Sequence, residues 1–284
     1  GLFFERDWSF GEKNFTHTFE PRAFYLYTPF DDQTGIGIFD TSTPTFNFTQ
    51  LFSRNRFAGI DRIGDANQIS AAITSRLIDD KGVERVNFTF GRIAYLQDRK
   101  VQLLDSTPRE TFRQSGLLAE INWRWTDRVE VKGAIDWDDQ RDLTQSGSFL
   151  LHYEPKENHI INIGHRFRRN FNRKIEEAEV AFAWPIKENW RILGRYSRDL
   201  SQNRTNESFF GLEYESCCWA VRLVNRRYLN IQLDTNGQLI ANQGDLHNSG
   251  VFVQFVLKGI GSLRGSTTEF LEESIYGYRD RLGK

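Results

Sequence analysis

The chain lacks methionine and contains only two cysteines and six prolines in 284 residues. It also lacks an apolar run of about 18 residues, which excludes transmembrane helices but not strands, since a strand crosses with about 9–11 residues of alternating character. An excess of one charge is missing too, because 37 basic and 38 acidic residues leave a net charge of −1. Without a basic footprint, we expect no nucleic-acid partner.

The first residue is Gly1 rather than methionine. We therefore expect a processed product or part of a longer protein, from which a signal peptide could have been lost. Aromatic residues are plentiful, with 24 Phe, 9 Tyr and 7 Trp. So many apolar rings must be buried somewhere, which argues against a disordered chain.

Apolar and polar residues alternate with period two along most of the chain, and two such runs joined by a short polar turn are typical of a β-hairpin. Residues 117–126 and 129–137 form the clearest pair, joined at Asp127-Arg128. Similar runs predict about 13 strands, or roughly 22 residues for each strand with its connection. The expected connections are short at 79–82, 126–128, 154–158, 186–189 and 215–218, and long at 28–66, 97–114, 138–146 and 229–248.

Short turns at one end and long loops at the other are typical of an outer-membrane β-barrel. A soluble β-sandwich also alternates, but one face here is too charged for a sandwich core. That face carries the residues we expect in a wet lumen: Glu120, Arg124, Glu130, Lys132, Asp136, Arg191, Arg195, Glu213, Arg222 and Arg226. The opposite face ends in rings that could form an aromatic girdle: Trp125, Trp137, Tyr153, Trp184, Trp190, Tyr214 and Trp219. We predict an all-β antiparallel meander of transmembrane strands.

The two cysteines are adjacent, Cys217-Cys218, in one of the short turns. Neighbouring cysteines are too close for an ordinary disulfide, so a strained ring is rare. Two separate bonds to cysteines outside this chain and a pair of buried free thiols both remain open.

Catalytic and metal-binding patterns are missing. The five histidines are scattered and form no ligand spacing with cysteine or carboxylate. No nucleophile–base arrangement is apparent, and Asp138-Asp139 is more simply a solvated pair. We expect no enzyme, no metal and no cofactor.

The connection 28–66 is unusually long, and loops of this length in an ordered fold are usually functional. Its end carries a motif of alternating amides and charges: Asn55, Arg56, Asp61, Arg62, Asp65 and Asn67. The charges suggest a loop that pairs with itself. A functional loop and a merely structural cap over a barrel mouth are equally compatible with this pattern.

Several segments together resemble the LptD family of lipopolysaccharide-assembly proteins. They are Phe4–Asp7, Glu20–Arg22, Asn55–Gln68, Val83–Tyr95, Asp98–Gln102, the Cys217-Cys218 turn and Val251–Gly259. The resemblance implies a Gram-negative outer-membrane barrel of about 26 strands, of which this chain would be the C-terminal half. It implies an N-terminal jelly-roll domain outside this chain that meets periplasmic bridge proteins, and an LptE-like lipoprotein that plugs the lumen.

The family inserts lipopolysaccharide into the outer leaflet through the lumen and a lateral gate. The resemblance makes residues 251–257 the closing strand of that gate, with Gly250, Val251, Val253, Phe255, Leu257 and Gly259 as its residues. We hypothesise that Gly250 and Gly259 flank the strand and limit it, because glycine weakens strands. The family also implies disulfides from Cys217 and Cys218 to two N-terminal cysteines, which need an oxidising periplasm.

The expected domains are therefore barrel wall over residues 1–258 and a C-terminal tail over 259–284, weakly helical at 269–275. The lumenal arginines could meet anionic sugars or phosphates in transit, although a static lattice of ion pairs is the simpler interpretation. Two alternatives to export remain: a passive porin-like channel, and a soluble β-sheet binding protein.

Overall fold

A computed structural model describes residues 1–11, 13–104, 107, 109–170, 173–230, 247–257 and 266–279. It contains 13 strands, as the alternation predicted: β1 Phe4–Phe10, β2 Lys13–Thr28, β3 Ala66–Asp79, β4 Glu84–Tyr95, β5 Leu117–Thr126, β6 Val129–Asp138, β7 Leu143–Tyr153, β8 Ile160–Asn170, β9 Arg173–Lys187, β10 Trp190–Asp199, β11 Arg204–Glu215, β12 Trp219–Leu229 and β13 His247–Leu257.

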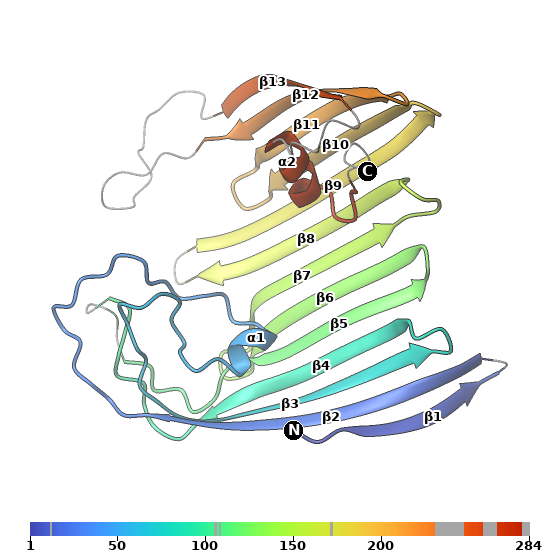
Figure 1. Cartoon of the computed structure of the whole chain (residues 1–284). Coiled ribbons are helices and arrows are strands. Elements are labelled where there is room, and N and C mark those ends of the chain that lie inside the picture. Colours follow the sequence, from blue (N-terminus) through green and yellow to red (C-terminus); the bar gives the residue numbers. More distant parts are fainter. Residues whose placement is uncertain are drawn as a thin grey trace. The chain divides into compact units, whose positions relative to one another are not determined.

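The strands follow one another in a single antiparallel meander, in which every strand pairs with its neighbours in sequence (Figure 1). Such a sheet needs no crossover connection, because antiparallel neighbours can be joined by a direct reversal of the chain, short or long. The predicted all-β meander is thereby confirmed. Among the described residues, we find no helix that combines the length and apolar character needed to cross a membrane.

The prediction of a long loop at 138–146 is wrong, since β6 continues to Asp138 and β7 already begins at Leu143. The Asp138 carboxylate accepts the backbone N–H groups of Gln140 and Arg141, at 3.0 and 3.1 Å. Asp142 then takes a positive φ of 50°, which closes the reversal in four residues. The side chain of Asp138 caps the turn locally, which the alternation alone does not reveal.

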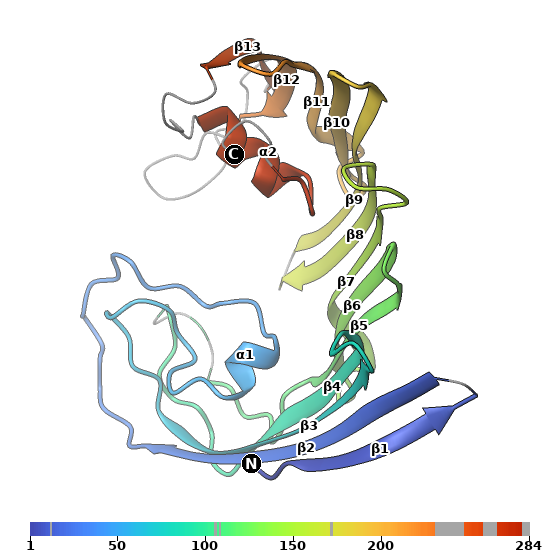
Figure 2. The ribbon, with the colours of Figure 1, turned by 45° about the vertical axis from the view of Figure 1, so that its right-hand side comes forward.

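The chain forms two compact units, residues 1–125 with 132–147 and residues 126–131 with 148–284. In the first unit, the short helix α1 (Phe48–Leu51) lies against one face of the strands (Figure 2). Leu51 is fully buried there against Ala72, Ile93 and Leu118, and Phe46, Phe48, Phe52 and Tyr95 pack around it. The Asn47 side chain accepts the N–H of Gln50 and begins the helix.

In the second unit, helix α2 (Ser266–Ser274) and the residues after it lie against one face of β8–β12 (Figure 2). Leu271, Ile275 and Tyr278 are buried on a seat of Ile160, Ala181, Ala183, Leu193, Phe209 and Val224. The helix largely coincides with the segment expected to be weakly helical. We call the face under α1 in the first unit, and under α2 in the second, the covered face, and its opposite the uncovered face.

The uncovered face of both units exposes large apolar side chains at alternate positions. They include Ile69, Ile73, Phe88, Phe90, Ile121 and Ile135 in the first unit, and Ile163, Val180, Phe210, Leu223, Val253 and Phe255 in the second. Aromatic rings gather on this face where the short turns join the strands. Tyr214 lies 4.8 Å from Trp190 and 5.1 Å from Trp219 between ring centroids.

Candidate functional site

The ten charged residues expected to share one face do lie on the covered face. Glu120, Arg124, Lys132 and Asp136 belong to the first unit, and Glu130, Arg191, Arg195, Glu213, Arg222 and Arg226 to the second. The structure brings only some of them together, some directly and others through Tyr278, Glu179 and Glu207.

A buried ion cluster occupies the covered face of β10, β11 and β12. Arg191 lies opposite Glu213, and Glu213 lies opposite Arg222, so the register alone places the three side chains in one row. Each arginine contacts its own oxygen of the carboxylate, with N–O distances of 2.5 Å for Arg191 and 2.7 Å for Arg222. The exposed fractions are 4%, 1% and 0%. Such a pairing is what permits charge at this depth.

Tyr278 completes this cluster from the end of the chain. Its hydroxyl accepts from Arg191 Nη2 at 2.7 Å and from Arg222 Nη2 at 2.8 Å, and donates to Glu213 Oε2 at 3.2 Å. Its ring also lies under the Arg191 guanidinium, 4.5 Å away. The tail therefore closes a four-membered polar cluster whose other members come from three strands.

A second row of charges follows on the same face. Glu207 accepts from Arg195 at 2.8 Å and from Arg226 at 2.6 Å, and Arg195 also contacts Glu179 at 2.5 Å. Phe270 of α2 lies 4.2 Å from the Arg226 guanidinium. Arg191, Arg195, Arg222 and Arg226 are all engaged by carboxylates of the same sheet, in agreement with a static ion-pair lattice.

The residues before Tyr278 dock beside the cluster. The Tyr276 hydroxyl donates to Glu130 at 3.1 Å, and its carbonyl accepts from Asn162 at 2.9 Å. Between the two tyrosines, Gly277 has φ +80°, and a Cβ there would lie 2.7 Å from the His152 ring. Both the backbone and the space thus favour glycine at this position.

The four charges of the first unit lie apart from this cluster, on β5 and β6. Glu120 accepts the backbone N–H of Phe48 at 3.1 Å and so holds the helix α1. Asp136 is buried, and its Oδ1 has no hydrogen-bond partner among the residues described. Arg124 and Lys132 are partly exposed on β5 and β6.

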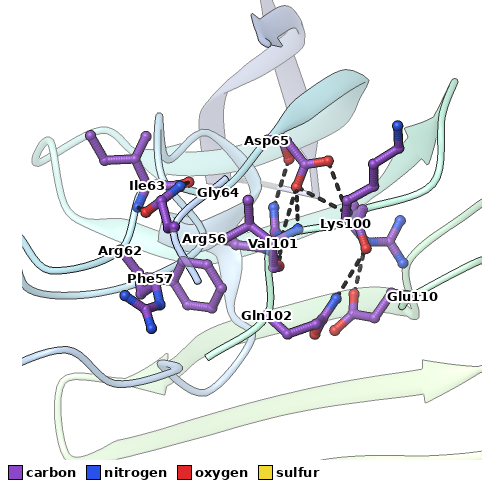
Figure 3. A network of polar contacts seen from close by, with 12 residues as sticks. Arg56, Phe57, Arg62, Ile63, Gly64, Asp65, Lys100, Val101, Gln102 and Glu110 are labelled. Carbon is purple, nitrogen blue, oxygen red and sulfur yellow. Dashed lines mark hydrogen bonds and ion pairs between the residues drawn. The ribbon is translucent and has the colours of Figure 1, made fainter. Parts of the chain in front are cut away.

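The loop motif forms a network around Asp65 (Figure 3). Asp65 is 1% exposed and accepts the N–H groups of Lys100 and Val101, at 2.8 and 3.0 Å. Arg56 contacts its carboxylate at 3.1 Å and also donates to the Asp65 and Val101 carbonyls. Asp65 thereby joins the end of the 29–65 connection to the 96–116 connection, a contact between the two long loops that was not predicted from the sequence.

Asn55 and Arg62 support this network, whereas Asp61 and Asn67 lie outside it. Asn55 donates to the Arg62 carbonyl at 2.9 Å and accepts the N–H of Gly64 at 3.0 Å. Asp61 instead accepts the N–H groups of Phe39 and Asp40, at 2.8 and 2.9 Å. Asn67 accepts from the Tyr25 hydroxyl at 3.2 Å. The loop pairs with itself, as its charges suggested, but around two centres.

The two loop carboxylates are held in their charged form. Burial by itself would raise the pKa of Asp65, but the N–H groups of Lys100 and Val101 and the Arg56 guanidinium outweigh it and keep the pKa below the ordinary value. The N–H groups of Phe39 and Asp40 lower the pKa of Asp61 in the same sense. Both carboxylates act as fixed acceptors of backbone donors rather than as proton carriers.

Cys217 and Cys218 lie exposed in the turn between β11 and β12. Their sulfur atoms are 2.8 Å apart, longer than the roughly 2.05 Å of a disulfide, so the two are not bonded to each other. Because both side chains are exposed, the alternative of two buried free thiols is wrong. Bonds to cysteines outside this chain stay a prediction.

The residues expected in the closing strand lie on β13, except Gly259, which is outside the described residues. Gly250 is inside the strand rather than at its start, because β13 begins at His247 and pairs with β12 throughout. Val251, Val253, Phe255 and Leu257 all point to the uncovered face. Within the described part of the chain, β12 is the one strand that pairs with β13.

Four residues of these clusters were not predicted from the sequence: Tyr278, Glu179, Glu207 and Gln254. The two glutamates could have been found, since they share the alternation that placed Arg191 and Glu213 on one face. Gln254, which accepts from Arg222 at 2.7 Å, shares it as well. Tyr278 carries no such signal, because it lies beyond the last strand. The described residues contain no group of three or more His, Cys, Asp or Glu side chains arranged to hold a metal.

Comparison with known proteins gives one consistent result. The family model LptD, described as LPS transport system D, matches residues 1–190. The protein named LPS-assembly protein LptD from Pseudomonas aeruginosa (strain UCBPP-PA14) is 38% identical over 312 residues, covering 99% of this chain and 33% of its own length. That of Ectopseudomonas mendocina (strain ymp) is 36% identical over 321 residues, covering 99% and 34%. The chain thus spans about a third of the length of these curated relatives.

Proposed function

The chain belongs to the LptD family, and on this premise we propose that it forms the C-terminal part of a barrel wall through which lipopolysaccharide is inserted into the outer leaflet. It is an outer-membrane protein of a Gram-negative bacterium. Moving a lipid requires a path and a gate rather than covalent chemistry, and we assign no catalytic step to these residues.

The observation that carries this proposal is the contrast between the two faces of the meander. The uncovered face presents exposed Ile, Val, Leu and Phe at alternate positions, with aromatic rings near the short turns. The covered face carries paired charges under α2 in the second unit, and Glu120 beside α1 in the first. Strands with lipid on one side and a polar interior on the other need this alternation.

We propose that β13 closes a lateral gate against a first strand outside this chain. Its side chains Val251, Val253, Phe255 and Leu257 would face lipid, while Gln254 holds Arg222 on the covered face. Opening the seam costs several kcal/mol for each backbone group left unsatisfied in lipid, so a short seam favours opening. A cysteine crosslink across the seam should stop export, and continued export through a locked seam would refute the gate.

The partners follow from the family and are proposed with it. An LptE-like lipoprotein would occupy the lumen, and periplasmic bridge proteins would meet the N-terminal part of the whole protein. Arg191, Glu213 and Arg222 are buried, whereas Arg124 and Lys132 are partly exposed on the covered face, so the plug would reach the last two. Cys217 and Cys218, exposed in their turn, would reach cysteines of the N-terminal part.

The test is depletion of the full-length parent protein in its native bacterium. Newly made lipopolysaccharide is followed to the cell surface, and assembly of an unrelated barrel serves as the control. Export predicts that surface arrival stops while the other barrel still assembles. If arrival continues and only the entry of small solutes falls, the protein is a passive channel and the proposal is wrong.

A further inference from the structure

The hairpin formed by β8 and β9 carries a dense positive charge in a chain of nearly balanced composition. Between His165 and Glu176, five residues are basic and one is acidic: Arg166, Arg168, Arg169, Arg173 and Lys174 against Glu176. The meander places this hairpin end on the side of the long connections, since β8 runs away from the short turn at 154–159.

The register divides these charges between the two faces. Ile160 and Asn162 contact the tail on the covered face, so Arg166, at an alternate position of the same strand, shares that face. The Arg166 guanidinium donates to the Glu177 carboxylate there at 2.6 Å. His165, Phe167 and Arg169 alternate with it on the uncovered face. Arg169 pairs with Lys174 across the hairpin, which brings that lysine to the same side.

On the uncovered face, two cations lie beside one aromatic ring. Arg169 lies 5.8 Å and Lys174 5.5 Å from the centre of the Phe167 ring. Glu176 contacts Lys174 at 2.8 Å and His165 at 3.2 Å, so a single carboxylate serves both. Arg169 and Lys174 are exposed and stand beside an aromatic surface, an arrangement suited to a negatively charged group at a membrane boundary.

The same two strands are apolar on this face nearer the short turns. Ile163 and Val180 are a pair in the register, and both are exposed there. The next pair is His165 with Ala178, and the cations follow. The side chains on this face thus change from apolar to cationic within a few residues. Such a boundary is expected where lipid headgroups meet a barrel wall.

We propose that His165, Phe167, Arg169 and Lys174 form a binding site for the phosphate groups of an anionic lipid in the outer leaflet. The proposal rests on the proposed function, because that function makes the long-loop side the outer side. Guanidinium and ammonium groups bind phosphate through charge-assisted hydrogen bonds, and the ring fills the space beside the sugar or acyl region. The site would hold newly inserted lipid against the wall.

The test uses the full-length parent protein in phosphatidylcholine vesicles that contain a minor fraction of labelled lipid A. A photoreactive benzophenone amino acid replaces Ala178, which lies opposite His165 without belonging to the site. Crosslinking to bisphosphorylated lipid A is compared with crosslinking to the same lipid after its phosphates are removed. We expect the phosphorylated lipid to be captured and the dephosphorylated lipid to be captured far less.

The variant R169Q/K174Q should lower the affinity for the phosphorylated lipid about 30-fold, since each surface cation contributes about fivefold. The charge-matched control K156Q/K187Q removes two exposed lysines elsewhere in the same unit and should leave capture unchanged. R169K/K174R keeps the charge and should retain most of the binding. Folding is checked by the heat-sensitive gel mobility of the barrel.

Equal capture by R169Q/K174Q and its control, or equal capture of both lipids, would overturn the proposal. Export is measured separately, as arrival of lipopolysaccharide at the surface of cells that carry R169Q/K174Q. Normal export with lost capture supports the site. If the parent protein proves not to export at all, the proposed function fails, and the vesicle experiment still decides whether the site binds phosphate.

Discussion

Replacing Tyr278 with phenylalanine should undock the tail from the covered face of the second unit. The change removes one oxygen, which accepts from Arg191 and Arg222 and donates to Glu213. The ring, and with it the contact to the Arg191 guanidinium at 4.5 Å, remains. The substitution therefore separates the contribution of the hydroxyl to docking from that of the apolar contacts made by Leu271 and Ile275.

The size of the effect follows from what the partners keep. Both arginines still contact Glu213, at 2.5 and 2.7 Å, so neither guanidinium is left without its carboxylate. The loss is three hydrogen bonds at about 1 kcal/mol each, or about 2–3 kcal/mol in the docking of the tail. That corresponds to an increase of about 30- to 150-fold in the undocked population.

Hydrogen exchange of the 266–279 peptide in the full-length parent protein measures this population. The matched control is Tyr276→Phe, which also removes one hydroxyl, in this case one that donates to Glu130 from an exposed side chain. It should cost about 0.5–1 kcal/mol, or about two- to fivefold. If Tyr278→Phe accelerates exchange no more than this control, the apolar seat holds the tail and the ion cluster does not.

Three further outcomes are expected. Asp65→Asn should weaken the loop network by about 1–3 kcal/mol and speed proteolysis of residues 29–65, whereas Asp32→Asn, whose contacts with Thr34 are local, should not. Because the pKa of Asp65 is lowered in the folded protein, the ionised carboxylate stabilises the loop fully above the unfolded pKa of about 4, and this stabilisation is lost as the pH falls through the folded pKa. Proteolysis of the loop should therefore speed up on acidification in the parent protein and not in Asp65→Asn. Gly277→Ala should weaken docking of the tail by about 1–2 kcal/mol from backbone conformation alone, and by more because the new Cβ would contact His152. Gly250→Ala is the control in the same exchange experiment, since a Cβ there would meet only Phe252, at 3.5 Å.

The strands could be predicted from the sequence because the residues of each strand alternate between the charged covered face and the apolar uncovered face. Leu223 and Val253 alternate with Arg222 and Gln254, and a period of two needs no knowledge of distant residues. The connections were less readable. The turn at 139–142 depends on one carboxylate that caps two N–H groups, and the alternation carries no trace of it.

The candidate sites divide in the same way. The alternation placed Arg191, Glu213 and Arg222 on one face, and the register of the structure then makes them cross-strand neighbours. The loop motif could be marked as unusual, but its partners Lys100 and Val101 lie 35 and 36 residues away in another connection. Asp61, six letters from Asn55, joins a different centre.

The sequence by itself determined the all-β meander, the charged and apolar faces of its strands, and the family, because alternation and local motifs are properties of short segments. Tertiary structure alone decided how the charges on the covered face are neutralised and what lies over them. Tyr278 completes the Arg191–Glu213–Arg222 cluster from beyond the last strand. No periodic pattern places a tail on a sheet, since that position depends on shape and charge contributed by three strands together.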